Sequence, residues 1–220
     1  RLLFETKALP SLLLNSAAAT NAVMLGSGYF HPLHGFMDKT DALSVAENLY
    51  TRSGLFWPVP VLNLTLEGSA IQPGRRIALR DPNVDGAPVL AIQEVQSVEY
   101  LSDAEVVRLV TKIYRTNNLE HPGVATFTSL GRWVVAGPVQ VLNYSYFELE
   151  FPDTFRTAVQ IRDEIKERGW ETVVAFQTRN PMHRAHEELC KMARDAVGAD
   201  GVLIHMLLGK LKPGDIPAAV

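Results

Sequence analysis

Residues 172–189 read TVVAFQTRNPMHRAHEEL and join an apolar run to an amphipathic one. The run TVVAFQ predicts a buried strand, of the kind found in parallel sheets covered on both faces. Pro181 ends the strand pattern, and we expect a helix to begin after it. Two histidines, two arginines, an amide and an Asn-Pro pair crowd the turn. A turn that only reverses the chain needs far fewer polar groups, so we predict that this one holds a polyanion.

The same alternation of helix and strand extends to both sides of this turn. Residues 153–170 predict an amphipathic helix with Asp153 or Thr154 as its cap and Gly169 as its stop. Its inward side chains should include Phe155, Val159 and Ile165. Residues 201–208, GVLIHMLL, predict a second buried strand. Such alternation indicates an α/β domain, and we assign it residues 151–220.

Residues 1–150 have a different pattern, which predicts a mostly β domain. Short β-rich runs separated by turn compositions fill residues 55–100. A helix should follow, because Ser102 and Glu105 have capping-box spacing. We expect residues 123–143 to return to strands. The fold class is therefore α/β overall, with a β-rich first domain.

Composition limits the possible partners. The 220 residues carry a net charge of −3, which gives no support to bulk binding of nucleic acid or acidic membranes, so an anion site must be local. No apolar run approaches the roughly 18 residues that span a bilayer. We expect a cytoplasmic protein that forms part of a longer chain. The single cysteine, Cys190, excludes an internal disulfide and is expected to be a buried, inert thiol.

The residues around the turn suit a tetrahedral oxyanion. Ligands of open α/β sheets bind beyond the carboxyl ends of the strands, against helix N-termini that favour negative charge. Arg179 supplies a planar fork of donors, and Gln177 and Asn180 add neutral donors. His183 and His186 are three residues apart and should be neighbours on one helical face, in the first turn.

Two further expectations concern the helix and the reaction. We expect the histidines to lie beside an apolar stripe, free to point into a cleft; the stripe comprises Ala185, Leu189, Met192, Ala193 and Ala196. The turn is rich in donors and poor in bases. It therefore suits transfer onto a nucleophile that is already ionised, as in phosphoryl and nucleotidyl transfer.

The run QTRNPMHRAHE, residues 177–187, resembles the signature of the ATP sulfurylase family. Three further stretches resemble segments of that family, namely GYFHPLHGFM at 28–37, LFWPVPVLNL at 55–64 and GKLKPGDIP at 209–217. The resemblance implies a PUA-like N-terminal domain followed by a Rossmann-like nucleotidyltransferase domain. The family's later Gly-Arg-Asp segment would lie beyond Val220.

The resemblance also implies roles for individual residues. Gln177 and Arg179 would bind sulfate, and Thr178, Arg179 and Asn180 would form the catalytic turn. His183 and His186 would contact the β- and γ-phosphates of ATP and stabilise the departing pyrophosphate. All six of these residues would then belong to the ATP site.

The implied reaction converts sulfate and MgATP into adenosine 5′-phosphosulfate and pyrophosphate, as in sulfate assimilation. Magnesium would arrive with the nucleotide, and no protein-bound metal is expected. We expect no nucleic-acid or membrane partner. We also expect a homo-oligomer, whose number of subunits the sequence does not give.

Other interpretations of the same residues exist. His183, His186 and Glu187 could bind a metal, but the spacing His-x-x-His-Glu matches neither common zinc motif. The chain could be an adenylyltransferase with another anionic acceptor, or an RNA-binding module of PUA type. Lys210 and Lys212 could line the nucleotide cleft or be solvated, and His205 is expected to be a hydrogen-bonded core residue.

Overall fold

The computed structural model describes residues 2–206. The chain divides into two compact units, Arg1–Ala158 and Val159–Val220, and each is described by itself. The domain boundary that we expected near residue 150 stays a prediction. The segment GKLKPGDIP, with Lys210 and Lys212, lies outside the described residues.

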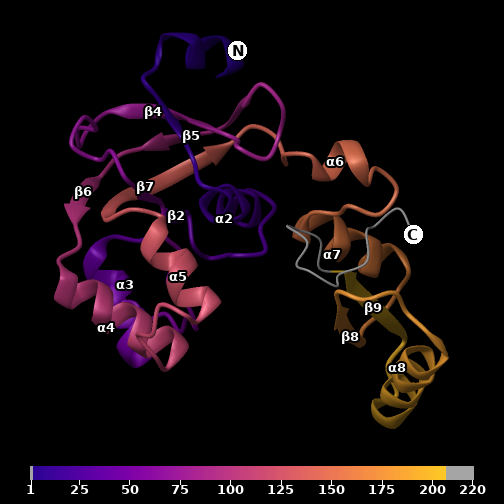
Figure 1. Cartoon of the computed structure of the whole chain (residues 1–220). Coiled ribbons are helices and arrows are strands. Elements are labelled where there is room, and N and C mark those ends of the chain that lie inside the picture. The colour runs from indigo at the N-terminus through magenta and orange to yellow at the C-terminus, as the bar shows by residue number, and fades with distance from the viewer. Residues whose placement is uncertain (1, 207–220) are drawn as a thin grey trace. The chain divides into compact units, whose positions relative to one another are not determined.

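The first unit is built on a sheet in the order β1-β4-β5-β7-β2, with β3 and β6 also paired to β7 (Figure 1). β1 runs parallel to β4, whereas the other pairings are antiparallel. The strands are β1 (Ser11–Leu13), β2 (Gly35–Phe36), β3 (Leu64–Thr65), β4 (Arg76–Arg80), β5 (Val89–Glu94), β6 (Ser97–Tyr100) and β7 (Trp133–Val141).

Helices pack on this sheet and on one another. α2 contacts β5 and β7, while α3 contacts α4, and α4 contacts α5. The core includes Val23 of α2, Leu90 of β5 and Val134 of β7, all buried. The helices are α1 (Leu2–Glu5), a 3-10 turn (Thr6–Ala8), α2 (Ser16–Gly26), α3 (Lys39–Asn48), α4 (Asp103–Tyr114), α5 (Pro122–Ser129) and α6 (Phe147–Glu150).

Two of our expectations for this unit are wrong in part. Residues 122–129 form α5 and not a strand, because Pro122 stands at the first helical position, where its fixed φ and missing N–H favour a helix start. Residues 55–63 contain no strand either: Phe56 forms only an isolated bridge with Tyr50, and the first strand after it is β3. The expected strands in 75–100 are confirmed, and so is the capping box of α4.

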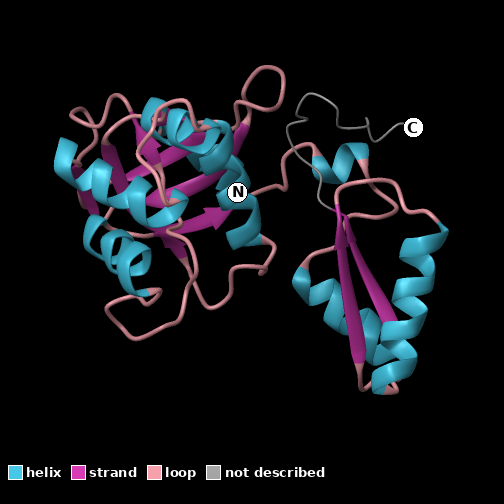
Figure 2. Ribbon diagram, turned by 60° about the horizontal axis from the view of Figure 1, so that its bottom comes forward, coloured by secondary structure: helices cyan, strands magenta, loops and turns pink. Residues whose placement is uncertain are grey.

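The second unit contains the predicted alternation of helices and strands. Its elements are α7 (Ala158–Glu167), β8 (Val173–Thr178), α8 (Arg184–Val197) and β9 (Gly201–Met206) (Figure 2). β8 and β9 pair in parallel from Val173↔Gly201 to Thr178↔Met206, and α8 packs against both strands. The predicted parallel α/β arrangement is confirmed.

Helix α7 differs from the prediction in its start. It begins at Ala158, not beside Asp153 or Thr154, and Val159 is 58% exposed where we expected it to face inward. The predicted stop is correct, since Gly169 has the left-handed φ of 68° that glycine adopts readily.

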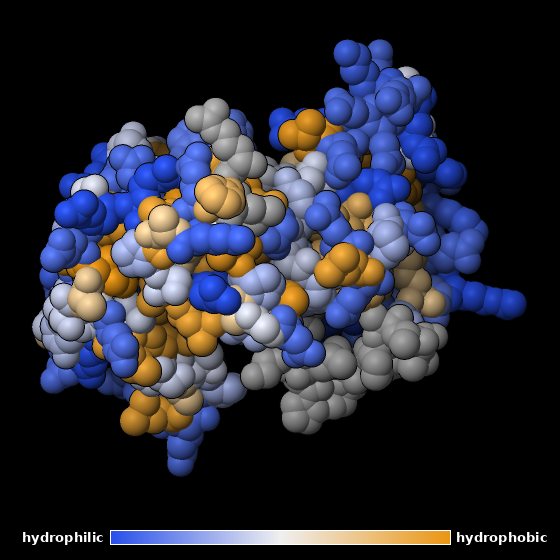
Figure 3. All heavy atoms as spheres, turned by 90° about the horizontal axis from the view of Figure 1, so that it is seen from above, coloured by the Kyte–Doolittle hydropathy of each residue, from blue (hydrophilic) through white to orange (hydrophobic). Residues whose placement is uncertain are grey.

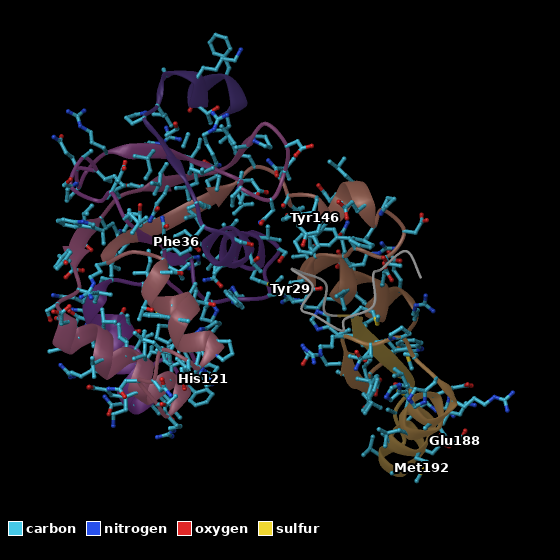
Figure 4. All side chains as sticks on the ribbon, in the orientation of Figure 1. Tyr29, Phe36, His121, Tyr146, Glu188 and Met192 are labelled. Atoms are coloured by element: carbon cyan, nitrogen blue, oxygen red, sulfur yellow. The ribbon has the colours of Figure 1, made fainter. Side chains whose placement is uncertain are left out.

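Helix α8 packs with a different face from the one that we predicted. Leu189 is 52% and Met192 65% exposed, whereas Cys190 is buried. Figure 4 shows Met192 and its neighbour Glu188 on this helix. Ala185 and Ala196 are exposed as well, so only Ala193 of the predicted stripe belongs to the packing face. The face that contacts the sheet is instead the one that carries Cys190 and Ala193.

Asp200 ties the starts of the two parallel strands together. Its carboxylate accepts hydrogen bonds from the backbone N–H groups of Thr172 (3.0 Å) and Glu171 (2.8 Å). Its own N–H donates to the carbonyl of Thr172. The two backbone donors lower the pKa of the Asp200 carboxyl. This contact lies at the end of the strand pair opposite to the turn that follows β8.

Candidate anion-binding site

The turn after β8 is closed by the hydroxyl of Thr178. This hydroxyl donates to the carbonyl of Asn180 (3.0 Å) and accepts from its N–H (3.1 Å). Thr178 is buried, while Gln177, Arg179 and Asn180 are exposed. The buried threonine therefore shapes the turn, and the predicted anion ligands lie on its outer side.

Helix α8 begins without a side-chain cap. His183 is its N-cap residue, with extended backbone (φ −129°, ψ 174°) and no side-chain cap hydrogen bond. The first helical residue is Arg184, so His183 precedes the first turn instead of lying in it. The N–H groups of His186 and Glu187 donate to the carbonyl of His183. An N-terminus of this kind favours an anion through its dipole and its first N–H groups.

The two histidines lie together at this helix start. Their ring centroids are 3.9 Å apart, with an interplanar angle of 30°. The ring of His186 also lies 5.5 Å from that of Phe176 on β8. His183 is exposed and His186 half-buried. The expected pairing of the rings is confirmed, but His186 lies on the packing face with Cys190 and not beside it.

One atom of His186 has no partner. Its Nδ1 is buried and forms no hydrogen bond within the part of the chain that the structure describes. Buried polar atoms are almost always hydrogen-bonded, so this atom distinguishes the ring from an ordinary packed histidine.

The acidic side chain in the first turn of α8, Glu187, has a cationic partner. Glu187 forms an ion pair with Lys191 one turn later (2.7 Å), and this contact lowers the pKa of the Glu187 carboxyl. Arg184 is exposed beside it. The start of α8 is therefore not dominated by negative charge, which suits an anionic ligand.

Residues 2–206 contain neither a three-residue metal cluster nor a helix that could span a bilayer. Among residues 2–206, no three His, Cys, Asp or Glu side chains are grouped so that they could hold a metal ion. Within the same residues, no helix combines the length and apolar character needed to cross a bilayer.

Sequence reasoning missed two features. Phe176 and His186 are ten residues apart and belong to different elements, so no local pattern signals their contact. In the first unit, an open hollow of about 620 Å³ is lined by His34 and Arg52, among others.

Comparisons with known proteins agree with this architecture. Residues 1–144 match the family model of the PUA-like domain, so the chain contains a member of that class. Residues 152–220 match the model of ATP-sulfurylase. The chain therefore belongs to the PUA-like family, and its residues 152–220 are similar to the ATP-sulfurylase family.

Curated relatives match along the whole chain. A sulfate adenylyltransferase of Alcanivorax borkumensis is 61% identical over 98% of this chain and 54% of its own length. One of Allochromatium vinosum is 61% identical over 100% of this chain and 55% of its own. The chain thus spans about half the length of the curated relatives that it matches.

A solved structure has a similar fold. It is described as a hexameric APS kinase from Thiobacillus denitrificans and superimposes with a TM-score of 0.71 at 27% identity. The match covers 97% of this chain and 37% of that one.

Proposed function

We propose that this chain supplies the PUA-like domain and the sulfate- and phosphate-binding turn of a sulfate adenylyltransferase. The observation that carries the proposal is the start of α8, where paired imidazoles and an uncapped helix N-terminus adjoin the exposed donors of residues 177–180. The relatives with that name, at 61% identity, support it.

In the proposed reaction, sulfate and MgATP give adenosine 5′-phosphosulfate and pyrophosphate. A sulfate oxygen attacks the α-phosphorus, and the bond from that phosphorus to the bridging oxygen of pyrophosphate breaks. Sulfate is already an anion, so no proton has to be removed, and a turn that is rich in donors and poor in bases suits this reaction. The task of the protein is to hold two anions together and stabilise the growing charge.

Each side chain of the turn has a role in this proposal. Gln177 and Arg179 bind sulfate, and Arg179 suits it because a guanidinium donates two parallel hydrogen bonds to an oxyanion. Thr178 and Asn180 keep the turn in shape through their mutual hydrogen bonds. His183 and His186 donate to the β- and γ-phosphates, and the N-terminus of α8 adds its dipole.

The remaining partners follow from the same proposal. Magnesium enters as part of MgATP, in keeping with the donor-rich turn, and is not a resident cofactor. We propose a cytoplasmic enzyme of sulfur metabolism that assembles as a homo-oligomer. The similar structure described as hexameric supports assembly.

Pyrophosphate exchange tests the function. Labelled pyrophosphate, ATP and Mg²⁺ are incubated with the purified chain, and also with a chimaera that continues after Val220 with the remaining part of the Allochromatium relative. We expect label to enter ATP only when sulfate is present. Exchange that ignores sulfate would instead indicate an adenylyltransferase with another acceptor.

A gel shift at physiological salt tests the remaining alternative. Salt-sensitive RNA binding at micromolar protein would favour an RNA-binding module of PUA type. We expect no shift, because the net charge of −3 offers no overall attraction to RNA.

A further inference from the structure

The chemistry of the histidine pair depends on which ring atoms can reach a ligand. An imidazole has two nitrogens, and a neutral ring carries its proton on only one of them. In His186, Nδ1 is buried without a hydrogen-bond partner among the described residues. Only Nε2 is then left to meet a ligand.

The burial of Nδ1 also fixes the proton. A buried N–H without an acceptor is rarer in proteins than an unsatisfied acceptor, and it costs free energy. The favoured neutral form of His186 therefore has a bare Nδ1 and a protonated Nε2. Such a ring is a donor on one side only.

The orientation of this ring is held from two sides. The Phe176 ring contacts it from β8, and the tilted ring of His183 lies 3.9 Å from it between centroids. Cys190, one turn later on the same face, is buried against the sheet. These neighbours limit the tilt of the imidazole plane.

We propose that Phe176 is a positioning residue that orients His186 so that Nε2–H alone serves as its donor to the anion. This inference rests on the proposed function and deepens it. Phe176 acts through His186 and does not itself touch the phosphate. His183, which is exposed, has no such restriction on its ring.

Two amide substitutions separate the ring nitrogens. Glutamine puts its side-chain nitrogen near the place of Nε2, whereas asparagine puts it near Nδ1. Pyrophosphate binding is measured by titration calorimetry on the chain. We expect H186Q to bind within about threefold of the unmodified chain and H186N at least about tenfold more weakly, the loss of one hydrogen bond to a charged group. Equal affinities, or the reverse order, would overturn the proposal.

Nitrogen NMR tests the orientation without any ligand. Long-range proton–nitrogen correlations show which nitrogen of His186 carries the proton, and we expect Nε2. A proton on Nδ1 would overturn the proposal even if pyrophosphate binds. Failure of the unmodified chain to bind pyrophosphate, with the proton on Nε2, would count against the proposed function and not against the orientation.

Phe176 is tested by F176L and F176Y. Loss of the ring should populate the other tautomer of His186 and weaken pyrophosphate binding about two- to tenfold, the size of an aromatic pair contribution. F176Y keeps the ring and should restore both readouts. An unchanged tautomer in folded F176L would refute the positioning role. The control is H121N, at an exposed histidine of the first unit, which should change neither readout.

Discussion

Helices α4 and α8 have N-termini that are built differently. The side chain of Ser102 accepts from the Glu105 N–H, and the Glu105 carboxylate accepts from the Ser102 N–H at 2.8 Å. α8 begins at His183, which offers its N-terminus no side-chain acceptor. Helix α4 thus satisfies backbone N–H groups at its start with its own side chains. Helix α8 leaves the N–H groups of its first turn without a side-chain acceptor.

Helix α4 also buries more side chains than α8 does. α4 buries Val106, Leu109 and Val110, whereas Cys190 is the only buried residue of α8. Exposed apolar side chains also occur elsewhere on the surface, as Figure 3 shows for one face. Helix α4 is built for stability, whereas the start of α8 leaves its first backbone N–H groups open to the anion that we propose.

The largest effect should come from Arg179. R179A should reduce sulfate-dependent exchange in the chimaera about 10²- to 10³-fold, the usual cost of losing a donor to a developing oxyanion. The fold should remain stable, because Arg179 is exposed and does not belong to the core. Exchange kinetics and circular dichroism measure the two outcomes.

The matched control for this change is R194A at the other end of α8, which should leave exchange unaltered. Arg194 bonds to the neighbouring Asp195 and is exposed. Unfolding of R179A would show that Arg179 is structural and would contradict its role as an anion ligand.

A side-chain cap at the start of α8 would make its N-terminus similar to that of α4. H183S supplies the missing cap acceptor and should raise the free energy of unfolding by about 0.5–1 kcal/mol. The same change removes an imidazole donor and should weaken pyrophosphate binding about tenfold. Urea unfolding and titration calorimetry measure this opposition. If stability and binding fell together, His183 would have to be a structural residue.

Removal of the side-chain cap from α4 is the reverse experiment. S102A removes the cap acceptor and should cost about 1 kcal/mol of unfolding free energy, with no change in pyrophosphate binding. Urea unfolding gives the stability. A loss of pyrophosphate affinity in folded S102A would mean that the two helix starts are coupled.

The smallest effect should be a pH dependence of α4. Hydrogen bonds from Ser102 and the contact with Lys39 lower the pKa of Glu105 from 4.5 to about 2. Because the folded state lowers the pKa of this carboxyl, the ionised Glu105 stabilises the fold at pH values above 4.5. This stability is lost as the pH falls from 4.5 towards 2. E105Q should flatten the stability curve in that window, measured by urea unfolding at each pH. An unchanged curve would show that the capping carboxylate contributes nothing.

Local patterns in the sequence predicted much of the fold. The capping box of α4, the strands in 75–100 and the alternation α7-β8-α8-β9 were all correct. Each depends on residues within one or two turns of one another, so the chain neighbours carry the information. The sequence pattern predicts a strand in place of α5, because the apolar and β-branched residues of this segment resemble a strand. Pro122 is the residue that favours a helix start there.

The candidate site divides in the same way. The six predicted residues, 177–180, 183 and 186, lie within ten positions, so one strand-to-helix turn brings them together. The roles assigned to them stay predictions. The contact of Phe176 with His186 and the packing face of α8 needed the tertiary structure, because both depend on how α8 lies on the sheet.

The sequence by itself determined that a strand, a donor-rich turn and a helix follow one another in residues 173–197, because hydrophobic period and turn residues act over short distances. Only the tertiary structure decided which side of α8 meets the sheet and which nitrogen of His186 is buried. Burial depends on which surfaces meet, and those surfaces belong to elements far apart along the chain.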